Sequence, residues 1–271
     1  MTATAPTLGE ILDDASELVA RVAAPWAGLL WLTAVPLRLS QAHFAARLAE
    51  LGDEAGAYGD HLRGLAFLTA IFFVFSLWGR AAFVRACTRR LRAGEETSRE
   101  PLRVPAGSVV AYVYAALAIE VAFYATALAV VTIPALALVA GLAAATSPLV
   151  ERPSLFRPFS VLSGSAGRAA PLAGLVFVFG AAFLLAALNL LVLVQVGLWL
   201  AGGVAGLDVA RWQGVLGVSN PRLLLVVAAG GWLLVEPWWL AALVAYVHAL
   251  RARTSGEDLR LWFERIRSAE A

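Results

Sequence analysis

The sequence has very few of the residues that build metal sites and soluble active sites. It contains one cysteine, Cys87, no lysine, and only 15% charged residues. A single cysteine excludes an intrachain disulfide and a cysteine-based metal site. The three histidines, His43, His61 and His248, show no HExxH or related spacing, and no P-loop pattern GxxxxGK(S/T) occurs. We therefore expect no catalytic residues, no metal site and no cofactor.

Apolar residues dominate instead. Of the 271 residues, 61% are hydrophobic, and the mean hydropathy is +0.77. Soluble globular chains are about 45–50% apolar and about a quarter charged, so this composition excludes a water-soluble enzyme. The formal charge of +2 gives no reason to expect a nucleic-acid partner. The composition predicts a multi-pass membrane protein whose partners are membrane lipids, other membrane proteins or further copies of itself.

Six stretches are apolar and long enough to cross a bilayer, which takes about 20 residues. They are residues 22–40 and 65–82, two spans within 108–148, residues 169–200 and residues 223–250. As one helix the 41 residues of 108–148 would measure about 60 Å, so we expect a turn at Pro134. The last two stretches are each expected to form one long helix that tilts or extends beyond the bilayer. Seven or eight spans are a weaker alternative.

The arginines are unevenly distributed between the two sides of these spans. Sixteen of the 21 lie at the two ends of the chain and in segments 80–107 and 149–168, and five lie on the other side. Basic residues concentrate in cytoplasmic segments, so both termini are predicted to be cytoplasmic in a bacterial inner membrane. An odd number of spans would remove this asymmetry. Residues 1–6 are too few and too uncharged for a cleaved signal, so we expect the first span to stay.

The two ends of the chain have the spacing of amphipathic helices. In residues 7–21 apolar side chains recur at i, i+3, i+4 and i+7, and Thr7 with Glu10 forms a capping box. The polar face is acidic, which favours a basic protein surface over anionic lipid. Residues 255–268 show similar spacing after Ser255, a candidate N-cap, and carry arginines on their polar face.

These end helices predict a cytoplasmic interface. One hypothesis places the two helices in contact through their opposite charges, and the alternative is two independent interfacial helices. Residues 155–169 are expected to form a cytoplasmic elbow, because Pro158 limits helix formation. The residues assigned to the interface are Glu10, Asp13, Asp14, Arg157, Arg251, Arg253 and Asp258. The chain is interpreted as one transmembrane domain, 1–271, with a six-span bundle over 22–250 between the end helices.

A few polar residues fall within the predicted spans: Glu120, Glu236, Asn189, Gln195 and Arg38. Ionisable side chains are costly there and are therefore candidate functional residues. At 1.5 Å per residue, Glu120 and Glu236 lie about 18 and 22 Å from the cytoplasmic side. They form either a carboxylate pair that binds a proton, a cation or a substrate headgroup, or two structural groups that are neutral or paired with Arg38 or a helix carbonyl. The structural interpretation is favoured, because two carboxylates without a third ligand are a weak pattern.

The helix around Glu236 carries residues that weaken helices. Pro237 follows the glutamate directly, and Gly230 and Gly231 precede it by one to two turns. Transporters use interrupted helices at their binding sites. The pattern therefore admits a loosened helix at this position.

Three stretches together resemble the bacterial family called the membrane domain of glycerophosphoryl diester phosphodiesterase. The first is LGEILDDASELVAR at 8–21, and the last is YVHALRARTSGEDL at 246–259. The middle one is a span that ends at Pro134, followed by SPLVE at 147–151 and by an elbow with Arg157, Phe159 and Gly164. The family's soluble phosphodiesterase barrel and its His-Arg-Gly motif do not occur in the sequence. The resemblance therefore implies a shared membrane architecture and no phosphodiesterase activity.

Three functions are compatible with these patterns. The first is a non-enzymatic accessory or scaffold subunit of a membrane assembly, favoured because catalytic motifs are lacking and the ends are charged and amphipathic. The alternative is a small transporter or lipid-handling protein that uses Glu120 and Glu236. An intramembrane enzyme ranks last, because it needs a nucleophile–base pair or metal ligands that the scattered histidines do not supply.

Overall fold

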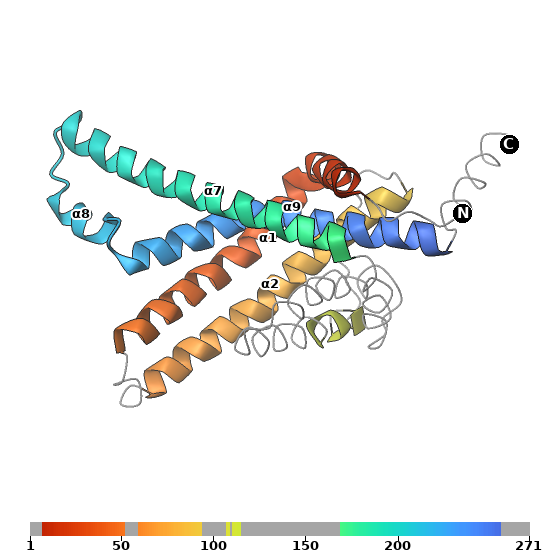
Figure 1. The fold of residues 1–271 in the computed structure, drawn as a ribbon. Helices are drawn as coiled ribbons and strands as arrows, with labels where there is room; N and C mark the ends of the chain where they lie inside the picture. The colour runs from red at the N-terminus through yellow and green to blue at the C-terminus, as the bar shows by residue number, and fades with distance from the viewer. Residues whose placement is uncertain (1–6, 52–58, 94–106, 109, 115–168, 256–271) are drawn as a thin grey trace. The chain divides into compact units, whose positions relative to one another are not determined.

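The described part of the chain is helical. The computed structural model describes residues 7–51, 59–93, 107–108, 110–114 and 169–255 (Figure 1), and no strand occurs among them. The helices are α1 (Leu8–Leu51), α2 (Gly59–Ala93), α7 (Ala169–Gly203), α8 (Ala210–Leu216) and α9 (Pro221–Ser255), and residues 107–108 and 110–114 are helical as well. The prediction of an all-α protein is confirmed for these residues.

Three helices are long and apolar enough to cross a membrane. Their spans are Gly59–Leu91, Ala173–Gly203 and Pro221–Ala249, and a fourth results if the bent pair Leu8–Val22 and Trp26–Leu51 counts as one crossing. The helices contain four of the predicted spans, and α7 and α9 are single helices of 35 residues each, as expected. The two spans predicted within 108–148 lie outside the described residues, except for 108 and 110–114. The membrane prediction is confirmed, and the total of six stays a prediction.

The chain divides into two compact units. The first comprises Met1–Trp26, Ala81–Phe177 and Trp238–Ala271, and the second comprises Ala27–Arg80 and Val178–Pro237. The four long helices contribute residues to both units. The single transmembrane domain expected from the sequence stays a prediction, and each unit is described separately below.

The first unit is built around the N-terminal part of α1. Thr7 N–H donates to Glu10 Oε2 at 2.9 Å, and Glu10 N–H donates to Thr7 Oγ1 at 3.3 Å, which confirms the capping box. The predicted apolar face is buried, including Ile11, Ala15 and Leu18. The start of α7 approaches this helix so closely that a Cβ on Gly174 would lie 2.9 Å from Leu8 Cδ2.

In the second unit, glycines allow helices to touch. A Cβ on Gly79 of α2 would lie 1.9 Å from Oγ1 of Thr33 on α1. Thr33 is fully buried, and its hydroxyl donates to the carbonyls of Leu29 and Leu30. Small residues at helix contacts in membranes permit this close approach. The contact fixes the position of α2 beside α1 directly next to Arg80.

Glycines also allow α7 and α9 to pack closely. A Cβ on Gly231 of α9 would lie 3.0 Å from the Cβ and backbone N of Ala187 on α7, and one on Gly230 would lie 3.0 Å from Leu190. Helix α9 is continuous through both glycines and Pro237, so the interruption considered from the sequence does not occur. The two glycines serve packing at this place.

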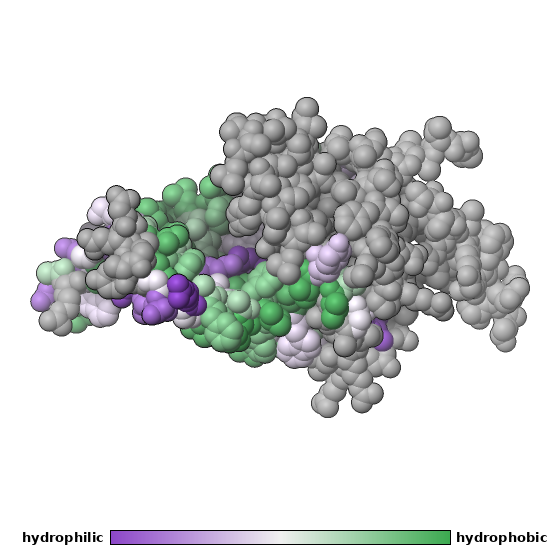
Figure 2. All heavy atoms as spheres, turned by 90° about the horizontal axis from the view of Figure 1, so that it is seen from below, coloured by the Kyte–Doolittle hydropathy of each residue, from purple (hydrophilic) through white to green (hydrophobic). Residues whose placement is uncertain are grey.

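Much of the described surface is apolar. The space-filling view in Figure 2 shows hydrophobic atoms over a broad area, with smaller groups of hydrophilic atoms among them. Helix α7 contributes most strongly to this apolar surface, because only 11% of its most apolar stretch of 18 residues is buried. A surface of this kind suits contact with lipid tails or with another membrane helix.

The contact between Gly79 and Thr33 makes a direct prediction. Gly79→Ala should lower the stability of the purified protein by about 1–3 kcal/mol, because the added methyl group overlaps the threonine and forces the helices apart. Gly64→Ala, on the same helix with no atom within 4 Å of the added Cβ, is the matched control. It should be neutral or stabilise by up to about 1 kcal/mol, the helix preference of alanine over glycine. Thermal unfolding in detergent, followed by tryptophan fluorescence, measures both; equal effects would contradict the packing role of Gly79.

Candidate functional site

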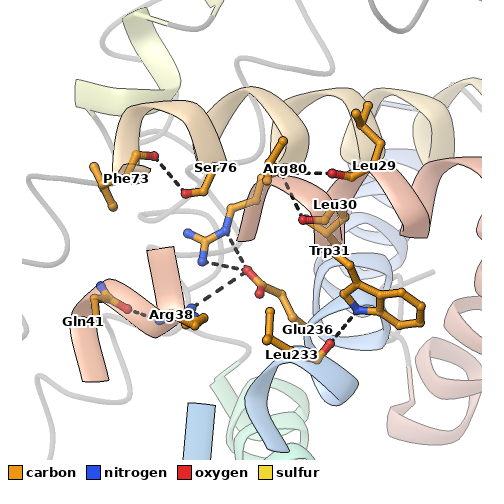
Figure 3. A network of polar contacts seen from close by, with 11 residues as sticks. Leu29, Leu30, Trp31, Arg38, Gln41, Phe73, Ser76, Arg80, Leu233 and Glu236 are labelled. Carbon is orange, nitrogen blue, oxygen red and sulfur yellow. Dashed lines mark hydrogen bonds and ion pairs between the residues drawn. The ribbon is translucent and has the colours of Figure 1, made fainter. Parts of the chain in front are cut away.

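A buried carboxylate lies at the contact of three helices in the second unit. Glu236 of α9 is 1% exposed. Arg80 of α2 donates from Nε to Glu236 Oε1 at 2.7 Å and places Nη2 2.6 Å from the same oxygen (Figure 3). Arg38 of α1 places Nη2 4.0 Å from this oxygen. We call these three residues the arginine–glutamate cluster.

The arginine from α1 is positioned by two neighbours. Its Nη1 donates to Gln41 Oε1 at 2.9 Å, one helical turn further along α1. Its guanidinium carbon lies 5.8 Å from the ring centroid of Trp232 on α9, within the range of a cation–π contact. Trp232 in turn packs edge-on against Phe183 of α7, with ring centroids 6.2 Å apart. Polar and aromatic contacts thus link α1, α7 and α9 around the cluster.

The charges of the cluster are shielded from solvent. The side chains of Arg80 and Arg38 are 13% and 21% exposed. Removing a carboxylate and guanidinium groups from water costs several kcal/mol per ion, and close pairing is what offsets this cost. Arginine suits this task, because its planar fork presents several donors and stays charged. The cluster therefore ties α1, α2 and α9 together through charge.

The contacts of the carboxylate are one-sided. Both arginines approach Oε1, whereas Oε2 is buried and has no hydrogen-bond partner in the described part of the chain. The indole Nε1 of Trp232 is likewise buried without a partner there. Buried polar atoms of this kind are rare, and each calls for a water, a ligand or a strain that explains it. They mark the neighbourhood of Glu236 as the candidate site.

Pro237, directly after Glu236, allows a further hydrogen bond between α9 and α1. Pro237 has no N–H, so the carbonyl of Leu233, four residues earlier, lacks its helical donor. Trp31 of α1 supplies the missing donor: its Nε1 donates to Leu233 O at 2.8 Å (Figure 3). The proline that would weaken an isolated helix is thereby used to join α9 to α1, one turn from Glu236.

The structure joins two of the residues predicted for an intramembrane site. Arg38 and Glu236 meet, as the structural interpretation proposed, but Arg80 is the closer partner. The distribution of arginines assigns Arg80 to the cytoplasmic segment 80–107, whereas it lies inside the candidate span Gly59–Leu91. The signal was in the sequence, because the apolar run AAFV at 81–84 continues beyond Arg80. Glu120 lies outside the described residues.

The two predicted polar residues of α7 lie elsewhere. Gln195 donates from Nε2 to Leu216 O at 2.8 Å and so holds the end of α8 against α7. Asn220 supports the same connection by donating to Val215 O at 2.7 Å. Asn189 is exposed in the middle of α7.

The predicted interface residues are partly described. Asp14 and Glu17 line a cavity of about 180 Å³ together with Leu18 and Arg21 of α1 and Arg90 and Leu91 of α2. The acidic face of the N-terminal helix thus does face basic residues. Burial, followed by the charge of Glu17, raises the pKa of Asp14, and His248 opposes this shift.

The other predicted interface residues that the structure describes lie near the ends of helices α1 and α9. Glu10 and Asp13 are exposed on the N-terminal helix, and Arg251 and Arg253 lie in the last turns of α9. Helix α9 is described as far as Ser255, and the helix expected over 255–268 otherwise lies outside the described residues. Arg157, Asp258 and the elbow up to Arg168 lie outside the described residues.

Neither the comparisons nor the geometry indicates a known chemistry. No protein-family model, curated protein or solved structure matches the chain. Within the described ranges, no group of three or more His, Cys, Asp or Glu side chains is placed to hold a metal ion. Cys87 is buried.

The contribution of the Trp31–Leu233 hydrogen bond to stability should depend on Pro237. Trp31→Phe is expected to cost about 1 kcal/mol, because the Leu233 carbonyl loses its donor. In a Pro237→Ala background the cost should fall by more than half, because the restored backbone N–H can bond this carbonyl within the helix. Thermal unfolding of the four proteins gives the coupling energy. Trp212→Phe, at an exposed tryptophan of α8, is the control and should change neither background; an equal cost of Trp31→Phe in both backgrounds would contradict the link.

The ion pair predicts a strongly non-additive double substitution. Arg80→Leu and Glu236→Leu should each destabilise by about 3–5 kcal/mol, because each leaves a buried charge without this partner. The double variant Arg80→Leu/Glu236→Leu should recover most of this loss, since apolar pairs often replace buried ion pairs at little cost. Expression level and thermal unfolding in detergent measure whether the double variant is more stable than either single variant. Additive losses would show that the two residues act separately.

Proposed function

We propose that this chain is a non-enzymatic, multi-pass membrane protein that acts as an accessory or scaffold subunit of a membrane assembly. The proposal includes six spans, a bacterial inner membrane and cytoplasmic termini, as expected from the hydropathy and the arginines. The observation that carries it is the arginine–glutamate cluster. A carboxylate held by one arginine at 2.6–2.7 Å and flanked by a second resembles a structural tie more than an open binding site.

The rest of the second unit supports a rigid role. Glycine contacts join α1 to α2 and α7 to α9, and the Trp31–Leu233 bond joins α1 to α9. The pair Glu50–Arg222 links the end of α1 to the start of α9. The helices so joined leave a broad apolar face on α7. Fixed geometry with an apolar flank is what a subunit needs to bind neighbours in the bilayer.

One observation favours the second candidate, a small transporter or lipid-handling protein. Glu236 Oε2 and Trp232 Nε1 are buried acceptor and donor groups without a partner among the described atoms. A bound polar group could satisfy both. The family resemblance points in the same direction only through its name, since it implies architecture and no activity. Glu120, the other carboxylate of this hypothesis, lies outside the described residues.

A paired purification decides between the two candidates. The tagged wild-type chain and the Arg80→Leu/Glu236→Leu variant are extracted from native membranes into polymer-bounded discs and analysed by native mass spectrometry. The accessory role predicts a stoichiometric protein partner, retained by the double variant once it folds. A solitary chain that carries a polar lipid or solute, lost in the double variant, would reverse the ranking. The Gly64→Ala protein serves as the matched control for substitution in α2.

A further inference from the structure

Helix α7 carries a polar side chain where a membrane offers no partner for it. Asn189 lies near the midpoint of the candidate span Ala173–Gly203 and is exposed. No hydrogen bond or other polar contact joins its side chain to the rest of the described chain. A carboxamide has one acceptor oxygen and two N–H donors. In hydrocarbon these groups find no water, so burying them without partners is costly.

The surroundings of Asn189 have the spacing of a helix–helix seam. Ala182, Leu185, Asn189, Val192, Val196 and Trp199 recur at intervals of three and four residues, the repeat of a left-handed pair of helices. The large apolar members are exposed: Leu185 by 60%, Val192 by 49%, Val196 by 45% and Trp199 by 67%. The opposite side of α7 is occupied, because Ala187 and Leu190 contact the two glycines of α9. We call this exposed row the α7 seam.

We propose that the α7 seam binds the α7 seam of a second copy of this chain, with the two Asn189 side chains hydrogen-bonded to each other. Two copies inserted in the same direction are related by a two-fold axis along the membrane normal. That axis makes the helices parallel and places both Asn189 side chains at one depth. The carboxamide is self-complementary, so each can donate to and accept from the other.

A second copy fits this seam better than an unrelated helix. An apolar partner would leave the Asn189 amide unsatisfied, whereas an identical chain brings the matching group at the matching depth. A single asparagine at such a position also fixes the register of the pair, because every slipped alignment separates the amides. The dimer goes beyond the accessory role and does not depend on it: it forms whether or not another subunit binds.

Dilution in lipid tests the role of Asn189. Wild-type chains labelled with donor and acceptor dyes are reconstituted into vesicles at decreasing protein-to-lipid ratios, and energy transfer reports the dimer. Asn189→Leu should weaken dimerisation by about 3- to 20-fold, the range measured for hydrogen bonds between membrane helices. Asn189→Gln should retain most of the affinity, because it keeps the amide. Leu184→Ala, exposed on α7 but outside the seam, should change nothing. A monomeric wild type, or an Asn189→Leu dimer as tight as wild type, overturns the proposal.

Crosslinking tests the geometry with a separate readout. The chain has one cysteine, buried Cys87, so Cys87→Ala gives a cysteine-free background. Single substitutions Val192→Cys and Val196→Cys in the seam should form disulfide-linked dimers in native membranes, and Leu184→Cys should not. Crosslinking at Leu184→Cys alone, or at none of the three, overturns the proposal. Neither result depends on a protein partner, so failure here leaves the accessory role standing, and failure to find a partner leaves the dimer standing.

Discussion

The second unit depends on the contact between Arg80 and Glu236, because a charge inside a membrane must be paired or removed. The contact spans two helices far apart in the sequence and keeps both charges almost free of solvent exposure. Two neighbouring residues support this contact: Gly79 lets α2 lie close to α1, and Arg38 of α1 adds a second positive charge. Because the arginines replace the water around Glu236, the carboxylate is stable only in this arrangement of the helices.

Proline and glycine have the opposite role from the one they have in isolated helices. Pro237 removes a helical hydrogen bond, and the freed Leu233 carbonyl becomes the acceptor for Trp31. Gly230 and Gly231 remove side chains, and α7 fills the space with Ala187 and Leu190. In both cases a residue that destabilises an isolated helix allows a contact between two helices. Within the bilayer this exchange is favourable, since packing and hydrogen bonds replace the hydrophobic effect as the source of helix association.

The sequence predicted the elements far better than their contacts. Apolar length located α2, α7 and α9 because a bilayer demands about 20 apolar residues whatever the fold. The capping box at Thr7 and the apolar face with Ile11 are local patterns and were confirmed. Arg80 was missed as a site residue because the positive-inside rule treats arginines as a group, and only a tertiary contact shows which one turns inward. No periodicity reveals that Glu236 and Arg80 share a depth.

The contrast between Glu236 and Asn189 separates the contacts within one copy from the association that we propose. The carboxylate is charged, and its pairing within the chain is strong and local. The carboxamide is neutral, so it can remain exposed in one chain and still be satisfied by another. A charge left on the surface of α7 would oppose insertion, whereas an amide there costs less and retains specificity. Buried ionic contacts therefore fix the helices of one copy, and the exposed amide is suited to select a second.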